Sequence, residues 1–115
     1  MAEIAYTVTK YPDAQLFEWA DGNAGDTGKE LDLSEHRGAI HEWEVAGSLN
    51  GATVACTGGF VSGETWSALE SVDGDLLSFT APGGGLAQRA PLFVKHTITG
   101  GTPSGLKVRL LVRYR

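Results

Sequence analysis

The feature that most constrains this chain is the alternation of apolar and polar side chains over short stretches that end in turns. Apolar residues recur at every second position in residues 4–8 and again in residues 41–45, where His41 shares a face with Trp43 and Val45. A period of two residues is that of a β-strand with one buried face. Glycine occurs 16 times in 115 residues, and its tolerance of positive φ angles suits tight turns between strands. The sequence therefore predicts an all-β protein.

About eight short strands, separated by turn residues roughly every ten positions, predict an antiparallel β-sandwich or jelly roll. One domain spanning residues 1–115 suits this length. Asn50 and Gly51 predict a type I′ hairpin turn that joins the strand around Trp43 to residues 52–57. Residues 83–85, all glycine, are expected to form a flexible turn. A single helical turn is compatible only with residues 85–90.

Alternation also predicts which side chains point inward. His41 is expected as a partly buried, hydrogen-bonded ring, whereas Glu42 and Glu44 lie on the wet face of the same strand. The apolar residues expected in the core include Trp19, Leu31, Leu33, Trp43, Val54 and Cys56.

The sequence offers no arrangement of residues that predicts catalysis. His36, His41 and His96 are the only histidines, and their spacing matches no metal-ligand pattern. No Gly-x-Ser-x-Gly motif is present, and Cys56 is the single cysteine. The acidic residues 21–26 lack the spacing of an EF-hand. We therefore expect no catalytic residues, no metal and no cofactor, and a protein that works by binding.

Charge is distributed unevenly along the chain, which carries a net charge of −5. All 14 acidic residues precede residue 86, whereas six of the nine lysine and arginine residues follow it. The basic segment either steers docking onto an acidic partner or mixes with the acidic segment in the fold. The overall acidity argues against a nucleic-acid partner. No apolar stretch is long enough for a membrane helix, and no export signal is evident, so synthesis in the cytoplasm is expected.

Several segments together resemble a known family. These are residues 45–54 (VAGSLNGATV), 66–69 (WSAL), 77–81 (LSFTA), 99–101 (TGG) and 106–113 (LKVRLLVR). They are similar to small structural proteins of tailed bacteriophages, in particular the cement, or decoration, proteins. The resemblance covers most of the chain from about residue 37 onward. It implies a self-associating jelly roll or sandwich, as a dimer or trimer, bound non-covalently to the major capsid protein on the capsid exterior of the virion.

The segment after Val54 departs from the family's pattern. Residues 55–61 (ACTGGFV) stand where a more polar, acidic segment is usual. Two apolar side chains in a loop favour docking against protein. We therefore predict an apolar anchor and a basic anchor. Their residues are Phe60, Val61 and Trp66 for the first, and Arg109, Arg113, Tyr114 and Arg115 for the second.

Two other functions remain open from the sequence. A carbohydrate-binding module of a phage tail or fibre would use Trp66 as a stacking platform for a sugar ring. A head–tail joining protein would belong to the same virion class but form a ring at one vertex. Copy number per virion separates a shell-wide cement protein from a vertex ring.

Overall fold

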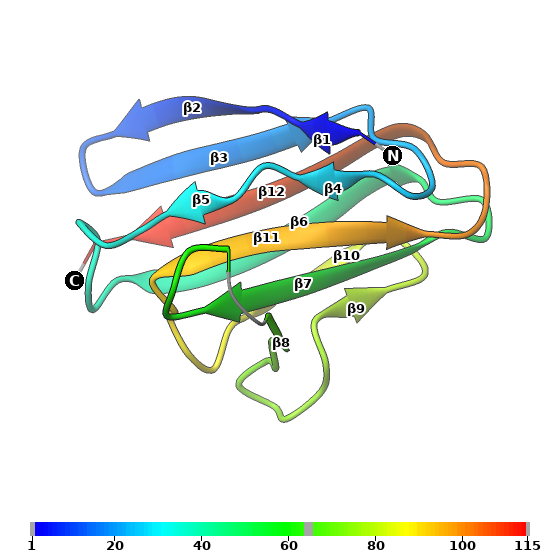
Figure 1. Ribbon diagram of the computed structural model, residues 1–115. Coiled ribbons are helices and arrows are strands. Elements are labelled where there is room, and N and C mark those ends of the chain that lie inside the picture. The colour runs from blue at the N-terminus through cyan, green and yellow to red at the C-terminus, as the bar shows by residue number, and fades with distance from the viewer. Residues whose placement is uncertain (1, 64–65, 115) are drawn as a thin grey trace.

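The alternation in the sequence becomes two stacked β-sheets in the computed structural model, which describes residues 2–63 and 66–114 (Figure 1). Within these ranges the chain contains twelve strands and no helix. The predicted all-β class and sandwich architecture are confirmed. The count exceeds the expected eight because five of the strands have only two residues each.

One sheet has five strands, all antiparallel to their neighbours. The C-terminal strand β12 lies at its centre and pairs along most of its length with β6 on one side and β3 on the other. The order is β10 (Gly83–Leu86), β6 (Ile40–Ser48), β12 (Ser104–Arg113), β3 (Ala14–Ala20) and β2 (Tyr6–Tyr11).

The other sheet has seven strands built around β11 (Phe93–Thr99) and β7 (Thr53–Gly59). These two pair in continuous antiparallel register, from Phe93 opposite Gly59 to Thr99 opposite Thr53. The remaining members are short: β1 (Glu3–Ile4), β4 (Thr27–Gly28), β5 (Leu31–Asp32), β8 (Ser67–Ala68) and β9 (Ser78–Phe79).

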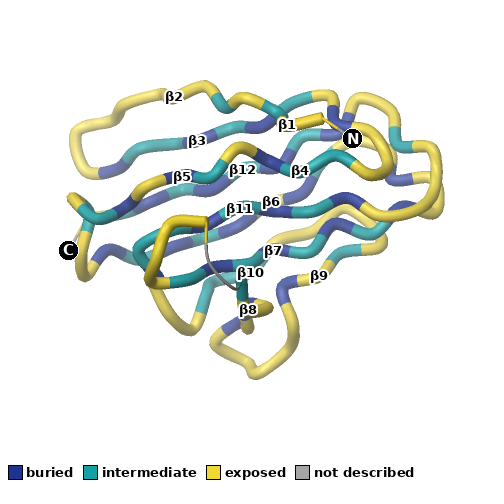
Figure 2. The backbone as a smooth tube through the Cα atoms, viewed as in Figure 1, coloured by how far each residue is buried: buried dark blue, intermediate teal, exposed yellow. Residues whose placement is uncertain are grey.

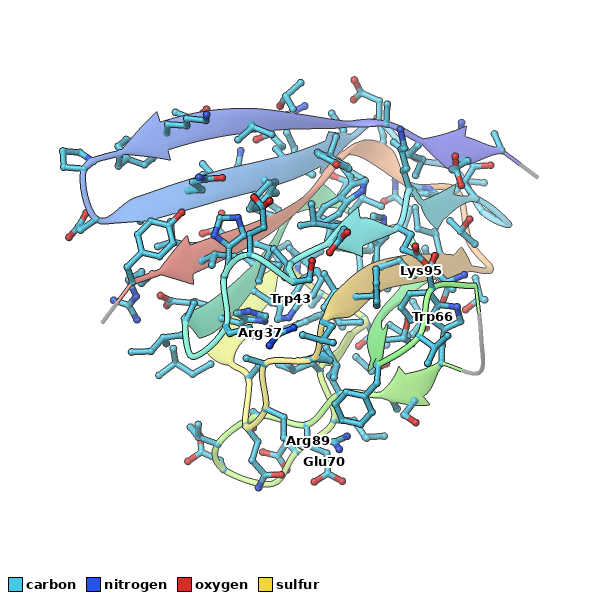
Figure 3. All side chains as sticks on the ribbon, turned by 60° about the vertical axis from the view of Figure 1, so that its left-hand side comes forward. Arg37, Trp43, Trp66, Glu70, Arg89 and Lys95 are labelled. Carbon is cyan, nitrogen blue, oxygen red and sulfur yellow. The ribbon has the colours of Figure 1, made fainter. Side chains whose placement is uncertain are left out.

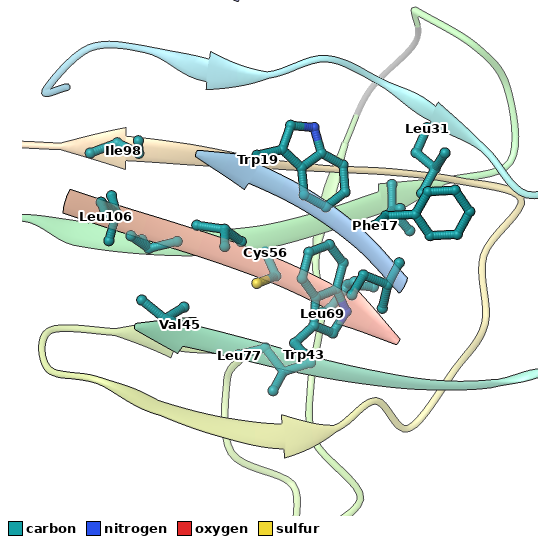
Figure 4. Close-up of a cluster of buried hydrophobic side chains, with 14 of the residues drawn as sticks. Phe17, Trp19, Leu31, Trp43, Val45, Cys56, Leu69, Leu77, Ile98 and Leu106 are labelled. Carbon is teal, nitrogen blue, oxygen red and sulfur yellow. The ribbon is translucent and has the colours of Figure 1, made fainter. Parts of the chain in front are cut away.

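The core fills the space between the inner faces of the two sheets (Figure 4). Trp19 stacks on Trp43 with ring centroids 6.0 Å apart, and both rings are buried. Leu31, Leu33 and Cys56 are buried as well. The predicted core positions are therefore confirmed. Exposed residues gather in the connecting loops and along β2 (Figure 2).

The turn at Asn50 and Gly51 forms as predicted, but the hairpin does not. Asn50 has φ 48° and Gly51 has φ 87°, and the Ala52 N–H donates to the Leu49 carbonyl at 2.9 Å. The two strands that this turn connects nevertheless belong to different sheets. Leu49 and Ala52 are both buried, so the chain turns through the core layer and crosses from one sheet to the other. The connection from β11 to β12 also crosses between sheets.

The glycine run at residues 83–85 forms part of strand β10 instead of a flexible turn, so that prediction was wrong. Gly84 pairs with Glu44 of β6. A Cβ atom on Gly84 would lie 2.7 Å from the Trp43 carbonyl oxygen. The absence of side chains thus lets this edge strand lie close against β6. The helical turn considered for residues 85–90 is likewise wrong, because its first residues belong to this strand.

Candidate functional site

The most exposed apolar pair in a loop follows β7. Phe60 is 69% exposed and Val61 is 56% exposed, and both belong to the apolar anchor predicted from the sequence. The loop lies at the same end of the sandwich as the C-terminus (Figure 1). Two adjacent large apolar side chains in water are unfavourable unless a partner covers them. They therefore mark a candidate contact surface.

The loop is fixed by an acidic residue 33 positions earlier in the sequence. The Glu30 carboxylate accepts a hydrogen bond from the Gly63 N–H at 3.0 Å and a second, short one from the Ser62 hydroxyl. Hydrogen bonds to a carboxylate are stronger than those between neutral groups. The residues directly after Phe60 and Val61 are thus held to the body of the sandwich, which orders the apolar tip.

Trp66 lies beside the same loop, but its ring already has a contact within the chain. The Lys95 ammonium lies 4.7 Å from the ring centroid (Figure 3), within the range of a cation–π interaction. Trp66 is partly buried. One face of the predicted stacking platform is therefore covered by Lys95.

A small hollow adjoins Phe60. Its volume is about 160 Å³, and its walls include Leu69, Pro91 and Arg89. Arg89 is exposed at the wall of this hollow. The apolar loop and the hollow together give a surface with one projecting aromatic ring, one recess and one cationic side chain.

Arg109, predicted as part of the basic anchor, is engaged inside its own sheet. Its guanidinium donates to Glu18 of β3 at 2.7 Å and to Glu44 of β6 at 2.6 Å. The register places these two acids opposite Arg109 on its two neighbouring strands. These two hydrogen bonds, first the one to Glu18 and then the one to Glu44, raise the pKa of Arg109.

Other members of the basic segment are also paired or stacked. Arg113 lies 3.2 Å from Glu42, and Lys107 lies 3.8 Å from Asp21. Tyr114 stacks on His36 with ring centroids 5.6 Å apart. Arg115 falls outside the described residues. The sequence left open whether the basic segment docks onto an acidic partner or mixes with the acidic segment in the fold. For Lys107, Arg109 and Arg113 the structure shows mixing, because each lies beside an acidic residue of the same chain.

The outer face of the five-stranded sheet is hollowed around this ion-pair cluster. The depression has a volume of about 860 Å³, and Leu16, Leu111 and Pro82 line it together with the charged groups. Leu16 and Leu111 face each other across β3 and β12. An apolar floor beside three carboxylates and the Arg109 guanidinium is a second surface able to contact a partner.

Two of the three histidines are buried. His41 and His96 are 2% and 0% exposed, and burial lowers the pKa of each to about 4. No ring nitrogen of either residue has a hydrogen-bond partner in the described part of the chain, so the expectation that His41 is hydrogen-bonded was wrong. Burial raises the pKa of the Cys56 thiol, which keeps it protonated. Within residues 2–63 and 66–114, no three His, Cys, Asp or Glu side chains gather as a metal site.

Two features of these surfaces escaped sequence analysis. Glu30 contacts a loop more than thirty residues away, and no local pattern marks that contact. The second feature is the outward-facing Leu16, and here the sequence does contain a usable pattern. Leu16 and Phe17 are adjacent apolar residues of one strand, and adjacent side chains of a strand point to opposite faces. Phe17 is buried, so Leu16 must face outward.

Comparisons with protein-family models, with curated proteins and with solved structures found no match to this chain. In the described residues there is also no helix of the length and apolar character that crossing a membrane requires.

Proposed function

We propose that this chain is a capsid cement protein of a tailed bacteriophage. It binds the major capsid protein on the outside of the head and stabilises contacts between neighbouring capsid subunits. The proposal rests on the resemblance to such proteins of most of the chain from about residue 37 onward, and on one structural observation. That observation is an exposed apolar pair, Phe60 and Val61, on a loop that Glu30 holds in place.

An ordered apolar tip suits binding to a protein surface. Burying a Phe or Val side chain contributes about 1.5–3 kcal/mol, and a tip that is already ordered loses less conformational entropy on binding. The adjacent hollow can accept a side chain of the partner, and the Arg89 guanidinium at its wall can pair with an acidic group. Weak contacts of this kind hold firmly when a self-associated protein engages several sites on one shell.

The first experiment is quantitative gel analysis of purified virions. A cement protein is present in a fixed ratio to the major capsid protein over the whole shell. A copy number limited to a single vertex would instead identify a head–tail joining protein. Absence from the head fraction would reject the proposal.

The second experiment measures binding to heads that lack this protein. Phe60→Ser combined with Val61→Ser removes the apolar tip, and we expect at least about tenfold weaker binding. The matched control is Val72→Ser with Leu76→Ser, which alters side chains that are 57% and 59% exposed on a different loop. Equal binding by both double variants would exclude the Phe60 loop as the contact.

A glycan array tests the carbohydrate-binding alternative. Selective binding that disappears in Trp66→Ala would replace the cement function with sugar recognition. In that case Lys95 would have to leave the Trp66 ring or share it, because its ammonium lies 4.7 Å from the ring centroid.

A further inference from the structure

The edge strand β2 combines features that favour pairing with another chain. Among the residues that the structure describes, β2 pairs with β3 on one side and with no strand on the other. It has six residues, most of them exposed (Figure 2). Its middle, Thr7-Val8-Thr9, consists of β-branched residues, which favour strands. An edge of this length with open backbone groups is a template for strand addition.

The other sheet edges are less suited to this role. In the seven-stranded sheet, the edge strands β1, β5, β8 and β9 have two residues each. In the five-stranded sheet, β10 begins with three glycines, which offer no side chain for cross-strand contacts. Very short edge strands resist unwanted pairing.

Val8 is an inward-facing residue that lacks cover. It lies opposite the buried Phe17 in the register of β2 and β3 and therefore faces the interior. It is nevertheless 44% exposed, since the other sheet ends on this side in the two-residue strand β1 (Figure 1). We propose that β2 pairs antiparallel with β2 of a second copy of this chain, about a two-fold axis at Val8.

The backbone and the side chains favour the same register. Tyr11 and Ala14 flank a two-residue turn and are paired, so they form a hydrogen-bonded pair. The backbone N–H and C=O groups of Tyr11 therefore point toward β3. Because this direction alternates along a strand, the N–H and C=O groups of the even-numbered residues of β2 point to the free edge. With a two-fold axis at Val8, the backbone of Val8 forms hydrogen bonds with the backbone of Val8 in the second copy. The backbone of Tyr6 likewise forms hydrogen bonds with that of Lys10 in the second copy.

The side chains in this arrangement are compatible on both faces. Val8 meets Val8 and Tyr6 meets Lys10 on the inner face, and Thr7 meets Thr9 on the outer face; β-branched pairs of this kind stabilise sheets. Lys10 lies opposite Tyr6, so no like charges face each other. The two five-stranded sheets become one continuous sheet in a symmetric dimer whose two contact surfaces are identical.

This inference specifies the self-association included in the proposed function, but its test uses the free chain without capsids. Analytical ultracentrifugation over a dilution series should give a dimer, twice the 12.1 kDa chain mass. Val8→Lys places two ammonium groups at the axis and should yield the monomer. Val72→Lys, at a site that is 57% exposed elsewhere, should leave the dimer intact. Circular dichroism establishes that both variants remain folded.

A cross-link tests the register. Paired Cα atoms at the axis are about 5.5 Å apart, so Val8→Cys should form an intermolecular disulfide on mild oxidation. Thr7→Cys should not, because the two Thr7 residues are offset by about 8 Å. A monomeric wild-type chain, a trimer, or a dimer unaffected by Val8→Lys would overturn the inference. A dimer that fails to bind heads would instead reject the cement function and leave this inference standing.

Discussion

Asn50 and Thr102 bond to each other in both directions at the end of the sandwich where the chain twice changes sheets. Asn50 Nδ2 donates to the Thr102 carbonyl oxygen at 3.0 Å, and the Thr102 N–H donates to the Asn50 carbonyl oxygen at 3.2 Å. The two crossings lie 52 residues apart in the sequence. This reciprocal pair ties them together and thereby fixes how the sheets join.

Asn50→Ala tests this link. Alanine loses the side-chain hydrogen bond and tolerates the positive φ of 48° poorly, so we expect the free energy of unfolding to fall by about 2 kcal/mol. Asn50→Gly keeps the backbone geometry and should cost about 1 kcal/mol. Urea denaturation measures both values. Equal stability of the alanine variant and the wild type would show that the link contributes nothing.

Gly84→Ala tests the close approach of β10 to β6. The added Cβ would lie 2.7 Å from a backbone oxygen of Trp43, so the strand must shift, at a cost of about 1–3 kcal/mol. Gly83→Ala is the control, because its Cβ would lie 3.7 Å from the nearest atom, in the Phe79 ring. We expect the control to change stability by less than about 0.5 kcal/mol. Similar urea midpoints for the two variants would contradict this account.

The buried histidines predict loss of stability in mild acid. Their pKa of about 4 in the folded protein lies below the ordinary value of 6.5, so the unfolded chain binds more protons as the pH falls through this interval. The free energy of unfolding should therefore decrease from pH 6.5 toward pH 4, by about 1.4 kcal/mol per pH unit for each histidine. Denaturant titrations across this range measure the slope. A flat profile would show that neither ring is held neutral by burial.

Replacement of Arg109 by methionine should destabilise the fold more than the same change at Arg113. Arg109 bonds to two carboxylates, whereas Arg113 has one acidic partner, Glu42, among the described residues. The difference is about 1 kcal/mol, because all these groups retain some solvent contact. It should shrink at high salt. Equal losses at low salt would mean that Glu18 and Glu44 do not act together on Arg109.

The strands and the core were predictable because alternation is a local property. Residues 41–45 show their buried and wet faces in the sequence itself, and the structure places His41, Trp43 and Val45 inside. The turn at Asn50 was predictable for the same reason. Whether the two strands flanking this turn pair with each other was not predictable. The same tight turn can connect neighbouring strands of one sheet or strands of two different sheets. The glycines of β10 carry no side-chain pattern, so the sequence gives no sign of their pairing.

The candidate site was only partly predictable. The exposure of Phe60 and Val61 follows from two apolar residues in a glycine-flanked loop. The position of Glu30 and the pairing of Arg109 with Glu18 depend on contacts between residues far apart in the chain. Such contacts are set by strand order, which the sequence pattern leaves undetermined.

Because of the uninterrupted ladder of paired residues between β7 and β11, the resistance of the molecule to an applied force depends on the direction of that force. Its paired residues run from Gly59 opposite Phe93 to Thr53 opposite Thr99. A pull along these strands strains all their cross-strand hydrogen bonds at once, whereas a pull on an edge breaks bonds one after another. The sandwich thus resists stretching between its Phe60 end and its Asn50 end more strongly than it resists peeling from the side.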